Sequence, residues 1–105
     1  MSEQLAWTDA AWKDYLYWQT QDKKTLKRIN KLITECKRNP FEGIGKPEPL
    51  KENLSGFWSR RIDDANRLVY AVDDNYLTII SCRYHYYRAL LIVRVYLLMA
   101  PYPIL

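Results

Sequence analysis

One histidine and three arginines in the second half of the chain stand where they could act together on an anion. His85 is the only histidine, and it lies near the end of a strand-like run, residues 76–86, in which alternate residues share a face. This alternation predicts that Arg83 and His85 lie on one side of a sheet, and tight hairpins would bring Arg61 and Arg67 to that side. Histidine exchanges protons near neutral pH, and guanidinium groups bind phosphate oxygens. The pattern predicts chemistry on an anion, with a phosphate as the first candidate.

The elements that would position these residues are three strand-like runs, residues 57–63, 67–73 and 76–84. Asp64-Ala-Asn66 and Asp74-Asn75 separate them with typical turn chemistry. The simplest meander places Arg61 opposite Arg67, and Arg67 roughly opposite Arg83. A register slip of one residue would break that alignment.

Two helices precede the meander. Residues 3–7 are typical of a short first strand, after which Thr8 or Asp9 caps a helix to about residue 19. Asp22 caps a second helix to about residue 38, where Asn39-Pro40 ends it. Its apolar stripe is Leu26, Ile29, Ile33 and Cys36. This order predicts an α+β fold with both helices packed on one face of a mainly antiparallel, twisted sheet.

Residues 39–56 are expected to form a long loop, because they carry all three glycines and three of the five prolines. Pro47 and Pro49 stiffen the backbone around Glu48. That carboxylate is either an exposed charge paired with a neighbouring lysine or the base of a site, and residue types alone favour the first.

Composition limits the class of protein. The chain has 105 residues with 49% hydrophobic and 27% charged residues, which is typical of a single soluble domain. The net charge of +4 points weakly towards an acidic partner. Two cysteines without ligand spacing exclude a zinc site, and no metal or cofactor is expected. There is no signal-peptide pattern, so the expected location is the cytoplasm.

The second helix carries a run of basic residues, which we interpret first as a solvated face. RNA or an acidic protein partner is the alternative. The run is Lys23, Lys24, Lys27, Arg28 and Lys31.

Residues 87–105 differ in composition from everything before them. They contain no acidic residue. Arg94 and Pro101-Tyr-Pro103 interrupt their apolar run, which argues against a membrane span. An extra strand, an interface helix and translation beyond the natural stop remain open. We therefore divide the chain into a domain of residues 1–86 and an extension of residues 87–105.

Several motifs, in this order and spacing, closely resemble the YoeB-type toxins of the RelE superfamily over residues 5–86. They are Trp12-Lys-Asp-Tyr-Leu-Tyr-Trp18, Pro40-Phe-Glu-Gly, Gly45-Lys-Pro-Glu-Pro-Leu-Lys51, Asn53-Leu-Ser-Gly-Phe-Trp-Ser-Arg-Arg-Ile62, Arg67-Leu-Val-Tyr70 and Cys82-Arg-Tyr-His-Tyr86. The resemblance implies a microbial-ribonuclease-like fold and metal-independent cleavage of mRNA in the ribosomal A site. It also implies a YefM-like antitoxin partner, and the family includes homodimers.

The resemblance also implies roles for individual residues. Glu48 matches the general base, His85 the general acid and Arg67 the phosphate-stabilising arginine. Lys51 and Arg61 match basic positions near the scissile phosphate. Tyr86 matches the tyrosine that normally ends the chain, whereas 19 residues follow it here. An alternative is a catalytically attenuated module that binds RNA or the antitoxin and acts in an autorepressor complex.

Overall fold

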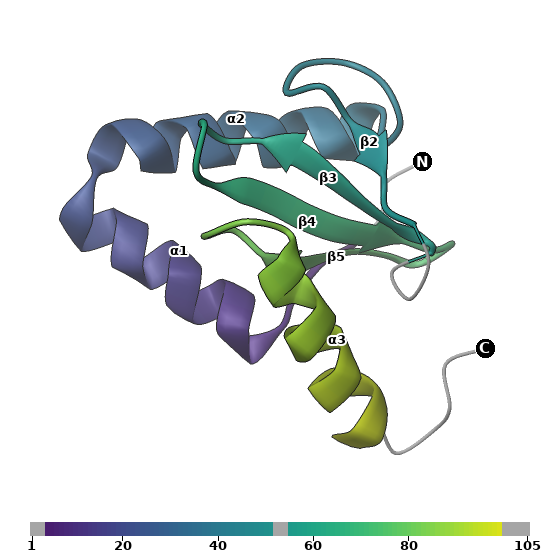
Figure 1. The fold of residues 1–105 in the computed structure, drawn as a ribbon. Helices are drawn as coiled ribbons and strands as arrows, with labels where there is room; N and C mark the ends of the chain where they lie inside the picture. The colour runs from purple at the N-terminus through teal and green to yellow at the C-terminus, as the bar shows by residue number, and fades with distance from the viewer. Residues whose placement is uncertain (1–3, 52–54, 100–105) are drawn as a thin grey trace.

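The computed structural model describes residues 4–51 and 55–99. A five-stranded sheet has the order β1-β5-β4-β3-β2, with β1 parallel to β5 and the other neighbours antiparallel. Figure 1 shows this sheet with α1 and α2 on one side. The elements are β1 (Gln4–Trp7), α1 (Asp9–Gln21), α2 (Lys23–Arg38), β2 (Glu48–Pro49), β3 (Phe57–Arg61), β4 (Arg67–Val72), β5 (Tyr76–Ser81) and α3 (Tyr87–Met99). The predicted α+β class and helix order are confirmed.

Side-chain caps set the beginnings of the first two helices, as the sequence predicts. The Thr8 hydroxyl accepts a hydrogen bond from the Ala11 amide at 3.0 Å. Asp22 accepts from the amides of Lys24 and Thr25, both at 3.1 Å. These bonds satisfy amide groups that have no partner within the helix, so each helix begins at a defined residue.

The sheet has an apolar core on each face. On the first face, α1 and α2 cover a large cluster that includes Leu68 and Tyr70 of β4. On the second face, Val69 lies in a smaller cluster completed by α3. The members of this smaller cluster are Leu50, Val69, Ile80, Ala89 and Val93. The sequence left open whether residues 87–105 form a strand or a helix, and their described part forms the helix α3. Its first turns lie against the sheet and its later turns run away from it (Figure 1).

The predicted alternation along residues 76–86 is wrong beyond residue 80. Val69 pairs with Ser81 but Tyr70 pairs with Ile79, so β5 carries one extra residue in a bulge. Cys82 then joins the core under α1 and α2, and Tyr84 has a positive φ of 67°. Arg83 does not join His85, because its guanidinium lies 3.4 Å from the centre of the Tyr17 ring on α1. A bulge leaves no signal in an alternating apolar pattern.

The loop predicted for residues 39–56 contains a short strand that the sequence did not reveal. In β2, Glu48 pairs with Ser59 and Pro49 with Trp58. The fully buried Arg60 holds the preceding segment, because its guanidinium donates to the carbonyls of Asn39, Glu42 and Ile44 and to the Tyr70 hydroxyl. This bonding satisfies a buried cation without a carboxylate.

Among the described residues, no helix combines the length and the apolar character that a membrane crossing requires.

Candidate functional site

Three of the predicted site residues lie on the sheet face opposite α1 and α2. Arg61 and Arg67 are directly paired between β3 and β4. Arg67 shares its face with Val69, two residues along β4, whose side chain lies in the α3-side core. Glu48 reaches the same face because it pairs with Ser59, which is two residues from Arg61 on β3. The strands therefore bring one carboxylate and two guanidiniums to a common surface.

His85 lies on a short segment that hydrogen bonds hold in place at several points. The Arg67 amide donates to the Tyr84 carbonyl at 2.9 Å, and the Asn66 side chain accepts from the Tyr84 amide at 2.6 Å. Upstream, the buried Asp14 accepts from the Cys82 amide at 3.0 Å. Because Asn66 sits in the turn before Arg67, the same turn fixes both the arginine and the histidine segment.

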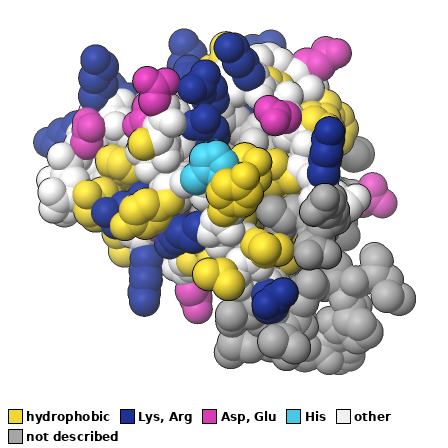
Figure 2. Space-filling model, in the orientation of Figure 1, with side chains coloured by type: hydrophobic (Ala, Val, Ile, Leu, Met, Phe, Trp, Pro, Cys, Tyr) yellow, Lys and Arg dark blue, Asp and Glu magenta, His cyan; other side chains and the backbone are white. Residues whose placement is uncertain are grey.

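The imidazole of His85 lies against two tyrosine rings. Its centre lies 4.1 Å from that of Tyr86 and 4.6 Å from that of Tyr87. The Nδ1 atom is buried and has no hydrogen-bond partner among the described residues. Nε2 is therefore the nitrogen that a bound substrate can reach. Figure 2 shows this histidine, in cyan, at the surface beside an apolar side chain, with basic side chains above and below it.

Tyr86 lies against the histidine, and two charged site residues influence its phenol. The pKa of its phenol is raised, first by a hydrogen bond with the Tyr87 side chain and then by partial burial. The carboxylate of Glu48 raises this pKa further and the guanidinium of Arg67 lowers it, so both charges act on the phenol. Both charged site residues therefore influence this phenol, and the His85 ring lies tilted against the Tyr86 ring.

The remaining cations differ in how they are held. Arg67 donates from Nη1 to the carbonyls of Asp63 and Asn66 at 2.6 and 3.1 Å, which holds its guanidinium at the strand end. Arg61 pairs with the exposed Asp64 at 3.2 Å, a contact weak enough to release for a substrate. Lys51 is exposed just beyond Leu50, and no described contact joins it to the other site residues.

The extension contributes to this site. Arg88 makes two bonds to the Asp14 carboxylate, at 2.7 and 2.9 Å, and one to the Arg83 carbonyl at 3.2 Å. Asp14 is only 3% exposed, so this ion pair is largely shielded from water. It fixes the first turn of α3 beside His85. Sequence reasoning missed both Asp14 and Asn66, because neither lies near His85 in sequence.

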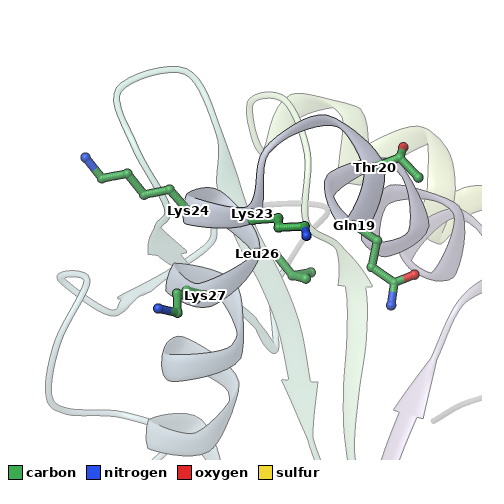
Figure 3. Close-up of a pocket in the computed structure, with 6 residues that line it drawn as sticks. All are labelled: Gln19, Thr20, Lys23, Lys24, Leu26 and Lys27. Atoms are coloured by element: carbon green, nitrogen blue, oxygen red, sulfur yellow. The ribbon is translucent and has the colours of Figure 1, made fainter.

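A separate hollow lies at the turn between α1 and α2 and includes none of the predicted site residues. Its lining is Gln19, Thr20, Lys23, Lys24, Leu26 and Lys27. Figure 3 shows Lys24 and Lys27 extending away from Lys23. All three lysines are exposed, which agrees with a solvated helix face. Among the described residues, no cluster of three or more metal-ligating side chains occurs.

Comparison with known proteins matches the part of the chain that precedes most of α3. Residues 7–86 match the family described as the YoeB-like toxin of bacterial type II toxin–antitoxin systems. Toxin YoeB of Escherichia coli K12 is 63% identical over 82 residues, which are 78% of this chain and 98% of that protein. A YoeB dimer structure from Staphylococcus aureus is 50% identical with a TM-score of 0.77, covering 82% of this chain and all of that one.

The YoeB–YefM complex from the same organism is 49% identical with a TM-score of 0.74, again covering 82% of this chain and all of that one. The match covers nearly the whole E. coli protein but only 82 residues of this chain. Most of residues 87–105 therefore have no counterpart in that relative.

Proposed function

The chain belongs to the YoeB-like toxins of bacterial type II toxin–antitoxin systems, and from that premise we propose that it is a ribosome-dependent mRNA endoribonuclease. The observation that supports this proposal is that β2, β3 and β4 bring Glu48 and Arg67 to one sheet face, while the Arg67 amide is bonded to Tyr84, next to His85. RNA scission by its own 2′-hydroxyl needs a base, an acid and cations that stabilise the extra negative charge. Glu48, His85 and Arg67 are the residues of this chain that could supply these three functions.

The proposed reaction proceeds by attack of the 2′-oxygen on the adjacent phosphorus. Glu48 takes the 2′ proton as the new P–O bond forms. Arg67, with Arg61 and Lys51, stabilises the charge on the phosphorane-like transition state. His85 donates a proton from Nε2 to the 5′-oxygen as its bond to phosphorus breaks. The products are a 2′,3′-cyclic phosphate and a free 5′-hydroxyl, and no metal takes part.

We place this activity in the cytoplasm, where mRNA on the ribosome is the substrate. A YefM-like antitoxin is the expected protein partner, because a homologue forms a YoeB–YefM complex. A homodimer is a second expected assembly, because another homologue structure is a YoeB dimer. Each of these assignments rests on the family relationship.

The first experiment compares Glu48→Gln and His85→Gln in a translation extract, scoring cleavage of a reporter mRNA. Each variant should lose about 10²- to 10⁴-fold of the cleavage rate, the usual contribution of one acid or base. Glu42→Gln is the matched control, because Glu42 is an exposed carboxylate of the same loop. Undiminished cleavage in both site variants would exclude the proposed mechanism.

A second candidate function has one observation in its favour, the position of α3 on the site face. Ala89 and Val93 pack against Leu50 and Val69 beside the site, so the extension could reduce RNA access in a binding module with attenuated activity. Deleting residues 87–105 distinguishes the two. Growth arrest by the shortened chain alone would support the attenuated module, whereas arrest by the full chain supports the nuclease.

The exposed lysines of α2 are proposed to contact ribosomal RNA. Such contacts release counterions, so affinity should fall steeply with salt. Replacing Lys23, Lys24, Lys27 and Lys31 with glutamine should flatten the salt dependence of ribosome binding. Binding with an unchanged salt slope would show that this face is only solvated.

A further inference from the structure

We propose that Tyr87 forms a nucleobase-stacking subsite with the rings of His85 and Tyr86, and that this subsite takes an unpaired base of single-stranded RNA. The proposal rests on the RNA-cleaving function above and adds a substrate contact to it. Tyr87 is the first residue of α3 and lies outside the segment matched by the family.

The three rings form one aromatic surface. Their centres are 4.1 Å apart for His85 and Tyr86, 4.6 Å for His85 and Tyr87, and 4.7 Å for Tyr86 and Tyr87. The interplanar angles lie between 33° and 46°. Tyr87 is nevertheless 68% exposed. The ring contacts both neighbouring rings, yet most of the residue's surface remains open to a ligand.

The Tyr87 backbone is held firmly enough to present this ring. Its neighbour Arg88 is bound by two hydrogen bonds to the buried Asp14. The Arg88 amide donates to the His85 carbonyl at 3.2 Å, and the Ala89 amide donates to the Tyr86 carbonyl at 2.9 Å. A ring that is fixed before binding loses little conformational freedom when a base stacks on it.

The surroundings favour RNA over an apolar partner. The Arg67 amide is bonded to the Tyr84 carbonyl, close to these rings, and its cation lowers the pKa of the Tyr86 phenol. Basic side chains lie above and below the histidine in Figure 2. An aromatic face beside a phosphate-binding cation is the usual recognition surface for single-stranded nucleic acid. A base next to the scissile phosphate would stack on Tyr87 while its phosphate lies near Arg67.

The experiment compares Tyr87→Ala and Tyr87→Phe with Leu91→Ala in the full chain. Leu91 is 63% exposed one turn later on α3 and is the matched control. The first readout is equilibrium binding of a short single-stranded RNA that has 2′-deoxy sugars, so that it cannot be cleaved. Quenching of a 2-aminopurine base in that RNA reports stacking. The second readout is KM and kcat for mRNA cleavage on programmed ribosomes.

Tyr87→Ala should bind the RNA about tenfold more weakly, within the range measured for base–aromatic stacking. It should also raise KM with little change in kcat. Tyr87→Phe, which keeps the ring, and Leu91→Ala should stay within about twofold of the unmodified chain.

Four results would each overturn the subsite. Two concern Tyr87→Ala, which would bind the RNA as tightly as the unmodified chain or would cleave mRNA faster. The others are an equal loss of binding in Tyr87→Phe and no saturable binding by the unmodified chain. Failure of the proposed nuclease function is distinguishable, because the unmodified chain would then leave mRNA uncleaved while the binding readout still decides the role of Tyr87.

Discussion

Removing the Arg88 side chain tests most simply whether the extension is part of the folded domain. Arg88→Ala leaves the Asp14 carboxylate without its cation, and the side chains are 29% and 4% exposed, respectively. Breaking a fully buried ion pair costs about 3–5 kcal/mol. Because Arg88 is nearly one-third exposed, we expect the free energy of unfolding to fall by about 2–4 kcal/mol.

The assay is urea unfolding followed by tryptophan fluorescence. Trp18 is a suitable reporter, because its indole nitrogen donates to the Cys82 carbonyl next to this ion pair. Arg94→Ala is the matched control, an exposed arginine on the same helix, and should change stability by less than about 0.5 kcal/mol. A double-mutant cycle with Asp14→Asn isolates the pairwise energy, expected at about 1–3 kcal/mol.

Equal stability of the Arg88→Ala and Arg94→Ala variants would refute the reasoning. It would mean that α3 does not hold its position through Asp14, and the placement of Tyr87 beside His85 would lose its main support. A large effect with no coupling in the cycle would instead assign the loss to other Arg88 contacts, such as its guanidinium 5.2 Å from the Tyr84 ring centre.

Three further predictions follow from local geometry. Burial raises the pKa of the Cys36 thiol to about 11. Iodoacetamide at pH 8.5 should therefore alkylate Cys36 at least about 100-fold more slowly in the folded than in the unfolded chain. The free energy of unfolding should fall as pH rises from about 9 towards 11, because the thiol ionises first in the unfolded chain. Gly45→Ala should destabilise the fold by about 1–3 kcal/mol more than Gly56→Ala in urea unfolding. Both glycines have positive φ, but only a Cβ at Gly45 would meet Leu32, at 2.8 Å. Asn66→Ala should slow mRNA cleavage about tenfold, a loss near that of one hydrogen bond, because it frees the Tyr84 amide. Asn66→Asp should retain most of the rate. Similar rates for both Asn66 variants would argue against this positioning role.

The sequence predicts the helices well because their signals are local. Thr8 and Asp22 each supply a cap within three residues of the amides they bind, and Asn39-Pro40 ends α2. The pairing of Arg61 with Arg67 is also local, since a short turn fixes the register. The bulge at Ile80 and Ser81 could not be predicted from the sequence. An isoleucine followed by a serine is equally compatible with a regular strand, so their residue types give no sign of the extra residue.

Long-range contacts explain the remaining misses. Asp14 binds the Cys82 amide and Arg88 across more than sixty residues of sequence, and no spacing rule links such positions. The two-residue β2 depends on pairing with β3, since its own proline-flanked sequence indicates a loop. The family motifs singled out Glu48, Arg67 and His85, whereas the contribution of Tyr87 became visible only from ring geometry.

Single-turnover cleavage of an mRNA with a 5′-bridging sulfur at the scissile phosphate tests the central assignment most directly. Sulfur leaves without needing a proton, so an enzyme that lacks its general acid should regain activity on this substrate. The assignment predicts that His85→Gln is restored to near the rate of the unmodified chain and that Glu48→Gln stays slow by about 10²- to 10⁴-fold. Equal defects on the sulfur and oxygen substrates in His85→Gln would contradict it.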